Sequence, residues 1–345
     1  MLKDNVLAIL LESEDFVSGA SVSRDLQVSR AAVNQAVKSL RAEGYEIESV
    51  TNRGYRLVSG PDRITSGSLQ AFLGIERMER VLCFDSTDST NRRVQEAVFN
   101  TPAAGTPDSS LQAPHGLIVV ANEQTAGRGR LGRTFASPQD MGIYMSVLLR
   151  PEVLSDASPS ASWTALTSWT AVAICRAIET VYGVQPGIKW VNDLYLGGKK
   201  ICGILTQMDL ETESGLIRDI IIGIGVNVQE QEKDFPEELR DIAGSLYQQT
   251  GRKIDRTVLA AEMIRQLDRL CADWTIPEAA AAYLADYRAH SLVTGRSVRV
   301  ISPRGTKEAT AESIGDDFSL HVRYTDGTEE ALRGGEISIR STDLS

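Results

Sequence analysis

Five apolar runs in the middle of the chain set the tightest limit on its fold. They occupy residues 116–122, 143–150, 187–196, 199–208 and 218–228. Short runs of this kind, bounded by turn residues, are typical of strands. Helical patterns accompany them at residues 90–99, 161–182 and 257–273. Because strands and helices alternate, we expect an α/β layer structure with a mixed sheet, placed at residues 65–290.

Residues 1–60 have a different pattern and predict a small unit of three helices and a hairpin. Ser21 is placed to cap a short second helix. Ser29 is placed to cap a third helix over residues 30–43. The segments on either side of the turn at residues 51–54 predict a β-hairpin. This order of elements is that of a winged helix-turn-helix.

The third predicted helix has an apolar face and a polar face of unusual content. Asn, Gln and Arg side chains make bidentate hydrogen bonds to base edges in the major groove, and arginines of a wing can contact phosphates. The predicted DNA-binding residues are Arg30, Asn34, Gln35, Lys38, Arg41, Arg53 and Arg56. The alternative is a solvated face on a module that contacts only protein. We favour DNA binding because the order of elements agrees with the residue types.

Composition marks the boundaries of the central region. Residues 59–67 are rich in Gly, Ser and Pro and predict a linker. Residues 100–116 have a similar composition and predict a surface loop. Short β segments separated by turns begin near the end of the central region, and they predict a small SH3-like β-barrel at residues 291–345. The predicted fold class is therefore multidomain α+β.

Charge and cysteine usage narrow the class of protein. A formal net charge of −10 excludes a general nucleic-acid coat, although a small DNA-reading surface remains compatible with it. The four cysteines lie far apart, which argues against a disulfide framework or a zinc site. The N-terminus has no signal-peptide pattern, and no apolar run approaches the roughly 20 residues that span a bilayer. We therefore expect a cytoplasmic protein without a membrane partner.

The segment "GRGRLGR" at residues 127–133 satisfies the pattern G-x-G-x-x-G. In a dinucleotide-binding fold a helix follows such a loop, whereas a predicted strand follows here, so that fold is excluded. No G-K-[ST] closes the segment, so it is not a P-loop either. Three guanidiniums on a glycine-rich backbone suit a triphosphate ligand that must be enclosed. An exposed basic turn is the alternative.

Six motifs, taken together, resemble the biotin–protein ligase family. They are "STN" at 89–91, "QTAGRGRLGR" at 124–133, "KWVNDLY" at 189–195, "KICGIL" at 200–205, "GIGVNV" at 223–228 and "GGEISIR" at 334–340. With the N-terminal unit, the whole chain resembles the family's bifunctional form, which combines a biotin ligase and a biotin operon repressor. This chain has Phe135 where the family commonly has Trp, and Val191 where it often has Pro.

The resemblance implies a role for individual residues. The implied biotin-binding set is Ser89, Thr90, Asn91, Gln124, Arg128, Gly129, Arg130 and Lys189. The implied ATP-binding set is Gly127, Arg128, Arg130, Arg133 and Asn227. Lys189 matches the family's active-site lysine, and Lys189 and Arg130 are the implied catalytic residues. No metal site of the protein's own is expected, because Mg²⁺ would arrive with ATP.

The implied activity is ATP-dependent formation of biotinoyl-5′-AMP, followed by transfer of biotin to a lysine of a biotin carboxyl carrier protein. The implied regulatory function is repression at the operator of biotin genes, with biotinoyl-5′-AMP as corepressor and a homodimer forming on ligand or DNA binding.

Three alternatives remain open at this point: a lipoate-type ligase, a ligand sensor with an inactive ligase domain, and a ligase whose helix-turn-helix no longer regulates. Intact Arg128, Arg130 and Lys189 argue against the inactive sensor. Acidic residues near the wing, Glu43 and Glu46 among them, keep the last alternative open.

Overall fold

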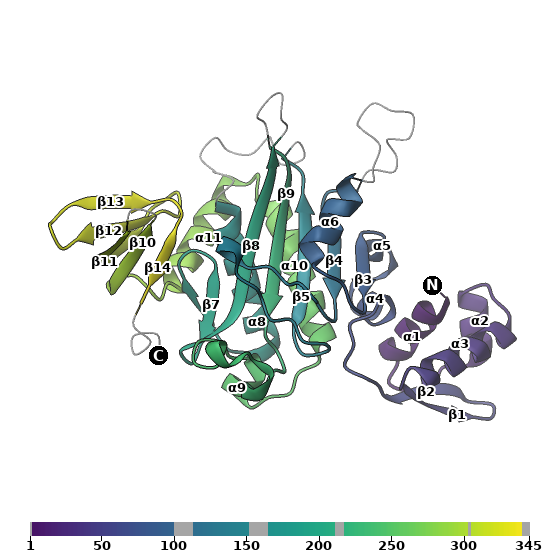
Figure 1. Ribbon diagram of the computed structural model, residues 1–345. Helices are drawn as coiled ribbons and strands as arrows, with labels where there is room; N and C mark the ends of the chain where they lie inside the picture. Colours follow the sequence, from purple (N-terminus) through teal and green to yellow (C-terminus); the bar gives the residue numbers. More distant parts are fainter. Residues whose placement is uncertain (1, 100–112, 152–164, 211–216, 303–304, 340–345) are drawn as a thin grey trace.

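Three units follow one another along the computed structural model (Figure 1). The structure describes residues 2–99, 113–151, 165–210, 217–302 and 305–339. The N-terminal unit lies at one end, a large α/β unit in the middle, and a small β unit at the other end. The predicted loop at 100–116 lies largely outside the described residues. None of the described helices is both long enough and apolar enough to cross a membrane.

The N-terminal unit is a winged helix-turn-helix, as predicted. Its elements are α1 (Leu2–Glu12), α2 (Gly19–Asp25), α3 (Arg30–Ala42), β1 (Glu46–Val50) and β2 (Gly54–Ser59). Ser29 caps α3, since its side chain accepts a hydrogen bond from the Ala32 amide. The prediction that Ser21 caps α2 is wrong, because α2 begins earlier and Ser18 caps it. Ser21 is instead a residue within α2, and its hydroxyl donates a hydrogen bond to the carboxylate of Asp25.

A seven-stranded mixed sheet forms the middle of the molecule. Its order is β3-β4-β5-β9-β8-β7-β6. The strands are β3 (Val81–Phe84), β4 (Ile118–Ala121), β5 (Ile143–Leu149), β6 (Gly187–Lys189), β7 (Asp193–Leu196), β8 (Lys199–Leu210) and β9 (Ile217–Val226). Only the β3–β4 pair is parallel among the described ladders of this sheet, so the predicted mixed sheet is confirmed. The run at 187–196 is two strands rather than one, because a turn at residues 190–192 divides it.

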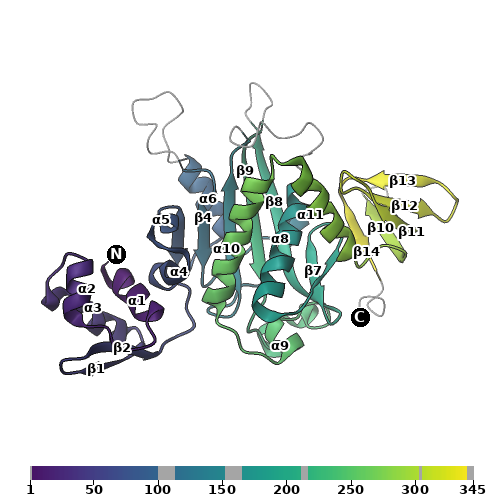
Figure 2. The same ribbon diagram turned by 180° about the vertical axis from the view of Figure 1, so that it is seen from behind.

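Helices cover the two faces of the sheet unequally (Figures 1 and 2). The long helices α8 (Ala165–Tyr182), α10 (Arg256–Asp273) and α11 (Pro277–Ala289) cover one face, and the main hydrophobic core lies beneath them. The other face carries α6 (Thr90–Phe99), which buries Val94 in a smaller core. The described parts of the three predicted helices agree with α6, α8 and α10. The short helices α4 (Ser66–Leu73), α5 (Ile75–Met78) and α9 (Leu246–Thr250) were not predicted.

The predicted linker is held against the central unit over residues 62–64. Asn122 is fully buried, and its side-chain amide pairs with both the N–H and the carbonyl of Ile64, at 2.9 Å each. Arg256 donates to the carbonyl of Asp62. The next helix, α4, packs against α1. Gly67 allows this close approach, since a Cβ there would lie 2.8 Å from the Asp4 backbone.

The C-terminal unit is an antiparallel sheet of order β13-β12-β11-β10-β14. Its strands are β10 (Ser297–Ser302), β11 (Gly305–Ile314), β12 (Leu320–Tyr324), β13 (Glu329–Leu332) and β14 (Glu336–Ser338). No pairing between the outer strands β13 and β14 closes the sheet within the described residues. The predicted small β unit is therefore present, and its closure into an SH3-like barrel stays a prediction. It is joined to the central unit by Trp190, whose indole donates to the Phe318 carbonyl at 3.0 Å.

Candidate active site

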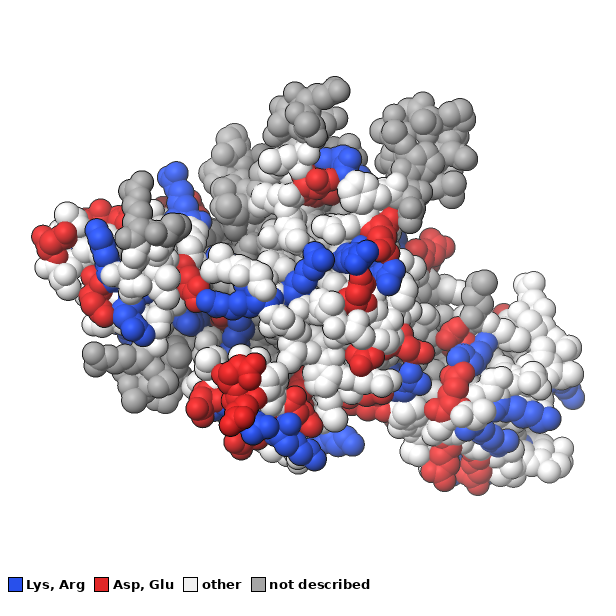
Figure 3. Space-filling view, in the orientation of Figure 1, with Lys and Arg blue, Asp and Glu red and all other residues white. Residues whose placement is uncertain are grey.

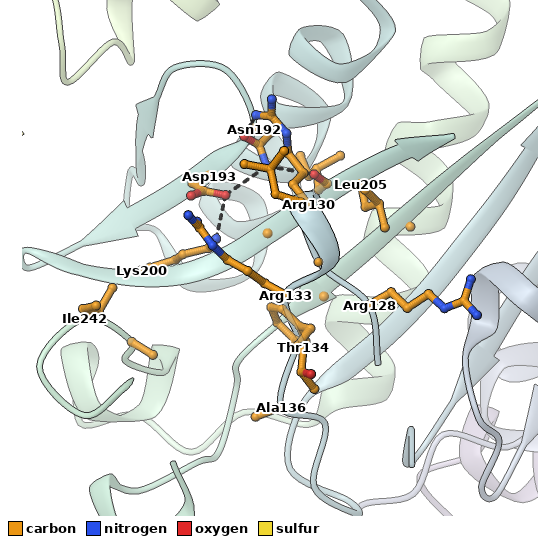
Figure 4. Close-up of a pocket in the computed structure, with 18 of the residues that line it drawn as sticks. Arg128, Arg130, Arg133, Thr134, Ala136, Asn192, Asp193, Lys200, Leu205 and Ile242 are labelled. Atoms are coloured by element: carbon orange, nitrogen blue, oxygen red, sulfur yellow. Dashed lines mark hydrogen bonds and ion pairs between the residues drawn. The ribbon is translucent and has the colours of Figure 1, made fainter. Parts of the chain in front are cut away.

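A cavity of about 490 Å³ opens on the face of the sheet that carries α6 (Figure 4). Segments far apart in the sequence form its walls: the start of α6, the loop at 127–136, the β6–β7 turn, strands β8 and β9, and β14. All eight predicted biotin-binding residues line this cavity. Of the predicted ATP-binding residues, Arg128, Arg130, Arg133 and Asn227 line it as well. The structure thus brings the candidate residues together in one place.

Gly127 is the predicted site residue that lies outside the cavity lining. A Cβ at this position would lie 2.4 Å from the Phe135 carbonyl oxygen. Its backbone also accepts a hydrogen bond from the Phe135 amide at 3.0 Å. Gly127 therefore lets the two ends of the loop pack together.

The triplet Ser89, Thr90 and Asn91 lies at the start of α6, and all three residues are buried. The backbone N–H of Thr90 donates to Gln124 Oε1 at 2.8 Å, and the Thr90 hydroxyl donates to the same oxygen at 3.1 Å. Gln124 Nε2 donates to Ser137 Oγ at 2.9 Å. Because these side chains are fixed in advance, the wall presents donors and acceptors of defined position to a polar ligand.

Glycines of the two central strands form the floor of the cavity. Gly203, Gly223 and Gly225 all line it. A Cβ at Gly225 would lie 2.5 Å from the Phe135 ring. Phe135, which replaces the family's common Trp, therefore packs directly on the floor. The motifs "KICGIL" and "GIGVNV" contain these glycines, yet their role as a floor was not predicted.

The loop arginines are paired across the cavity mouth. Arg130 donates to Asn192 Oδ1 at 2.7 Å and to the Gly335 carbonyl at 2.8 Å. Arg133 donates to both carboxylate oxygens of Glu336, at 2.7 and 2.8 Å. Arg128 extends from the loop in the direction opposite to Arg133 (Figure 4). The C-terminal unit thus contributes β14 to the site, and only the "GGEISIR" motif hinted at this in the sequence.

Two lysines reach the cavity from β6 and β8, the strands on either side of β7. Lys189 ends β6, and burial lowers the pKa of its amine. Its Nζ lies 5.7 Å from the centroid of the Tyr195 ring. Lys200 on β8 is held by Asp193, with Nζ 2.7 Å from Oδ1. Lys200 was not predicted as a site residue, although it begins one of the quoted motifs.

An apolar wall faces these cations. Phe235, Leu239, Ile242 and Ala243 line it. Asn227 braces this wall rather than pointing freely into the cavity, because its Nδ2 donates to the Gly244 carbonyl at 3.0 Å. Within the described parts of the chain there is no cluster of three or more His, Cys, Asp or Glu side chains arranged to hold a metal ion.

The predicted DNA-binding residues lie on one unit, and several already have partners. Arg30, Asn34, Gln35 and Lys38 are exposed on α3. Arg41 instead holds the wing, since its Nε donates to the Ile47 carbonyl at 3.0 Å.

The wing arginines pair with acidic side chains. Arg53 contacts Asp15 at 3.0 Å, and Arg56 contacts Glu48 at 2.7 Å. Basic and acidic side chains accordingly alternate over this unit in Figure 3.

Comparisons with known proteins agree with this arrangement. The model of the biotin/lipoate A/B protein ligase family matches residues 84–227, and a helix-turn-helix domain model matches residues 3–56. The bifunctional ligase/repressor BirA of Bacillus subtilis (strain 168) is 35% identical, covering 95% of this chain and 95% of that protein. The chain belongs to the bifunctional ligase/repressor family. Its enzyme class is that of the biotin–protein ligases that form an acyl-adenylate, as predicted.

Other family members and one solved structure extend the comparison. The Escherichia coli (strain K12) bifunctional ligase/repressor BirA is 29% identical, over 99% of this chain and all of that protein. The biotin protein ligase from Aquifex aeolicus, solved in complex with biotin and ATP, superposes with a TM-score of 0.61. It covers 76% of this chain and 99% of its own at 24% identity, and so supports the fold. The predicted ligase and repressor functions are confirmed at the level of the family.

Proposed function

We propose that the chain joins biotin to ATP in this cavity and transfers it to a lysine of a biotin carboxyl carrier protein. The observation that carries the proposal is the convergence of three predicted groups on one cavity. These groups are the Ser89–Asn91 triplet, the arginine loop at 127–133 and Lys189. The polar triplet suits the ureido ring of biotin, because a buried polar ligand needs its hydrogen bonds met.

The reaction has two steps. The biotin carboxylate attacks the α-phosphorus of ATP, which forms biotinoyl-5′-AMP and releases pyrophosphate. The amine of an acceptor lysine then attacks the acyl carbon, and AMP leaves. Both steps change the charge around one phosphate, so positioned cations contribute most to the rate. Mg²⁺ enters with the triphosphate of ATP, which it neutralises in part.

Lys189 and Arg130 are the proposed catalytic residues. Lys189 lines the cavity, and we propose that its amine contacts the carboxylate and α-phosphate oxygens. Lys200 lines the same cavity, and its ion pair with Asp193 holds it in place. Arg130 must leave Asn192 and Gly335 before it can clamp a phosphate. We therefore propose that the loop exchanges these protein partners for the ligand.

We also propose that biotinoyl-5′-AMP acts as the corepressor. The net charge of −10 opposes DNA association, and the wing arginines carry acidic partners. A single copy is therefore expected to bind DNA weakly, and two copies on a two-fold operator far more tightly. The proposed homodimer, formed when ligand is bound, links the cavity to the helix-turn-helix.

Biotin-dependent exchange of labelled pyrophosphate into ATP tests the ligase proposal. Exchange that requires biotin, followed by labelling of a biotin carboxyl carrier protein, supports it. Exchange that lipoate supports and biotin does not would favour a lipoate-type ligase instead.

A gel shift tests the repressor proposal on DNA upstream of a biotin-synthesis gene. We expect biotin plus ATP to raise the affinity at least tenfold, about 1.4 kcal/mol. Equal affinity with and without ligand would leave a ligase whose helix-turn-helix does not regulate.

A further inference from the structure

The side chain of Asn91 is held on three neighbouring strands of the central sheet. Ser146 of β5 donates from Oγ to Asn91 Oδ1 at 2.6 Å. Asn91 Nδ2 donates to Oε1 of Gln207, on β8, at 2.7 Å. Gly223 of β9 lies between them, and a Cβ there would stand 2.2 Å from Asn91 Oδ1. Ser146 and Gln207 therefore hold the Asn91 amide from two sides, and Gly223 leaves room for it because glycine has no side chain.

Ser146 and Gln207 lie behind the site rather than in it. Of Asn91, Ser146 and Gln207, only Asn91 lines the cavity. Ser146 is fully buried and stands opposite Gly223 in the β5–β9 ladder. Its oxygen also lies 2.7 Å from the Thr90 hydroxyl oxygen, so it contacts two members of the triplet, although its one proton can be donated to only one of them. Neither residue belongs to a motif that the sequence comparison singled out.

The chemistry of an amide gives this arrangement a consequence. A side-chain amide has two N–H donors and a carbonyl oxygen with two lone pairs. In Asn91, Gln207 uses one donor and Ser146 uses one lone pair, which leaves one donor and one acceptor for a ligand. An amide turned by half a rotation would exchange these two. Because a serine hydroxyl and a glutamine amide can each donate or accept, the two contacts fix the place of the Asn91 amide, and the structure has its Nδ2 toward Gln207.

We propose that Ser146 and Gln207 are positioning residues that hold the Asn91 amide in place for the ligand, with Nδ2 toward Gln207. The proposal rests on the biotin-binding role proposed above for Asn91. The held amide presents one donor beside one acceptor, and the ligand group that suits it offers both a carbonyl oxygen and an N–H, as a cyclic urea does. An amide that turned away from such a group would leave buried polar atoms unpaired.

Three variants test this role. Gln207→Met removes the acceptor at nearly constant length, and Gln207→Glu keeps an oxygen in its place. Thr206→Val is the matched control, because Thr206 is on the same strand and its hydroxyl contacts Thr167 at 2.7 Å rather than Asn91. The readouts are the biotin Kd by calorimetry without ATP, KM for biotin and for ATP and kcat from pyrophosphate exchange, and the thermal midpoint.

We expect Gln207→Met to raise both the biotin Kd and the biotin KM about tenfold, or about 1.4 kcal/mol. The kcat and the KM for ATP should stay within about twofold, since only binding of one substrate is affected. Gln207→Glu and Thr206→Val should retain biotin affinity close to that of the wild type. In an Asn91→Ala background, Gln207→Met should have no further effect on biotin binding, because its effect acts through Asn91.

Unchanged biotin affinity in Gln207→Met would overturn the inference. So would an equal loss in the Asn91→Ala background, or a parallel rise of both KM values with a lower thermal midpoint, which would mark a merely structural role. A wild-type protein that does not bind biotin would give a different result: it would overturn the proposed function itself, and this inference with it.

Discussion

Arginines join the central unit to its neighbours at two places, and the two joints are built differently. At the N-terminal joint, Arg256 is fully buried and donates to the carbonyls of Asp62 and Gly142. At the C-terminal joint, Arg130 and Arg133 reach from the loop to β14, and the Arg133 side chain is 65% exposed. A buried guanidinium with carbonyl partners is costly to unpair, whereas an exposed pair exchanges partners easily. One joint is therefore a fixed brace, and the other can be displaced by a ligand.

The two joints also lie at different distances from the chemistry. The C-terminal joint closes over the cavity, and its arginines line it. The N-terminal joint lies beside the end of β4 and the start of β5, where Arg256 contacts Asn122 and Gly142 and also Asp140 at 3.4 Å. We infer that ligand binding rearranges the loop and leaves the linker in place. The proposed effect of ligand on DNA binding then arises from pairing of two copies rather than from reorientation of the helix-turn-helix.

The largest effect is expected from breaking the fixed brace. Arg256→Met leaves the Asp62 and Gly142 carbonyls without their buried donor, so the free energy of unfolding should fall by about 3–5 kcal/mol. Urea unfolding measures it. Arg133→Met is the matched control, with the same side-chain change at the exposed joint. A loss under about 1 kcal/mol for Arg256→Met would mean that both joints are equally replaceable.

A change inside the cavity should give the opposite profile, with activity lost and stability kept. Lys189→Ala removes one positioned cation, so the exchange reaction should lose about 3–4 kcal/mol of transition-state stabilisation. Lys200→Ala is measured beside it, because both lysines line the same cavity. Near wild-type exchange in Lys189→Ala, with a large loss in Lys200→Ala, would move the catalytic role to Lys200.

A buried carboxyl near the fixed brace should make stability depend on pH. Burial raises the pKa of Glu230 to about 7 from 4.5. The folded protein then binds a proton that the unfolded chain has lost, so this contribution is complete below pH 4.5 and disappears as pH rises through about 7. At about 1.4 kcal/mol per pKa unit, the loss is on the order of 3 kcal/mol. Glu230→Gln should reduce the change in the free energy of unfolding between pH 4.5 and about 7, measured by urea unfolding at several pH values. An equal change in the variant and the wild type would assign the pH dependence to another group.

A smaller effect is expected when the displaceable joint loses its clamp. Arg130→Gly removes the contacts to Asn192 and Gly335 and the proposed contact to the adenylate. Biotinoyl-5′-AMP should leave about tenfold faster, or about 1.4 kcal/mol. The released acyl-adenylate should label lysines of an unrelated protein, which a streptavidin blot detects. Labelling confined to the acceptor would show that Arg130 does not retain the intermediate.

The smallest loss of stability is expected from breaking the ion pair between Arg133 and Glu336 at the C-terminal joint. Arg133→Ala breaks only the contact with Glu336, so the stability should change by less than about 1 kcal/mol. The difference should shrink further in high salt, which screens exposed pairs. Thermal unfolding at two salt concentrations measures it. A loss that is large and insensitive to salt would remove the distinction between the joints.

Local patterns predicted much of the fold and of the site. The apolar face predicted for the third helix is buried in α3, at Val33, Val37 and Leu40, and the apolar runs predicted the central strands. The glycine-rich loop and the triplet were found because each is a compact motif. α11 was missed because a run of alanines gives little contrast between its faces.

The contacts that join distant segments were not predictable. The composition of residues 59–67 predicted a linker but none of its contacts, and Asn122 and Arg256 hold it from far along the chain. The ion pair between Arg133 and Glu336 likewise joins residues 203 positions apart. Such partners are determined by the packed fold and leave no local periodicity. The Asn91 support from Ser146 and Gln207 was missed for the same reason.

Hydrogen exchange of the wild-type protein, with and without biotin plus ATP, tests the contrast between the joints most directly. Amides of residues 127–135 and 335–338 should change their protection when ligand is added, because Arg130 exchanges its protein partners for the ligand. Amides of residues 62–64 should be protected to the same degree in both states, because the buried joint stays closed. Equal changes at both joints, or an unchanged loop in protein that has formed the adenylate, would contradict the account.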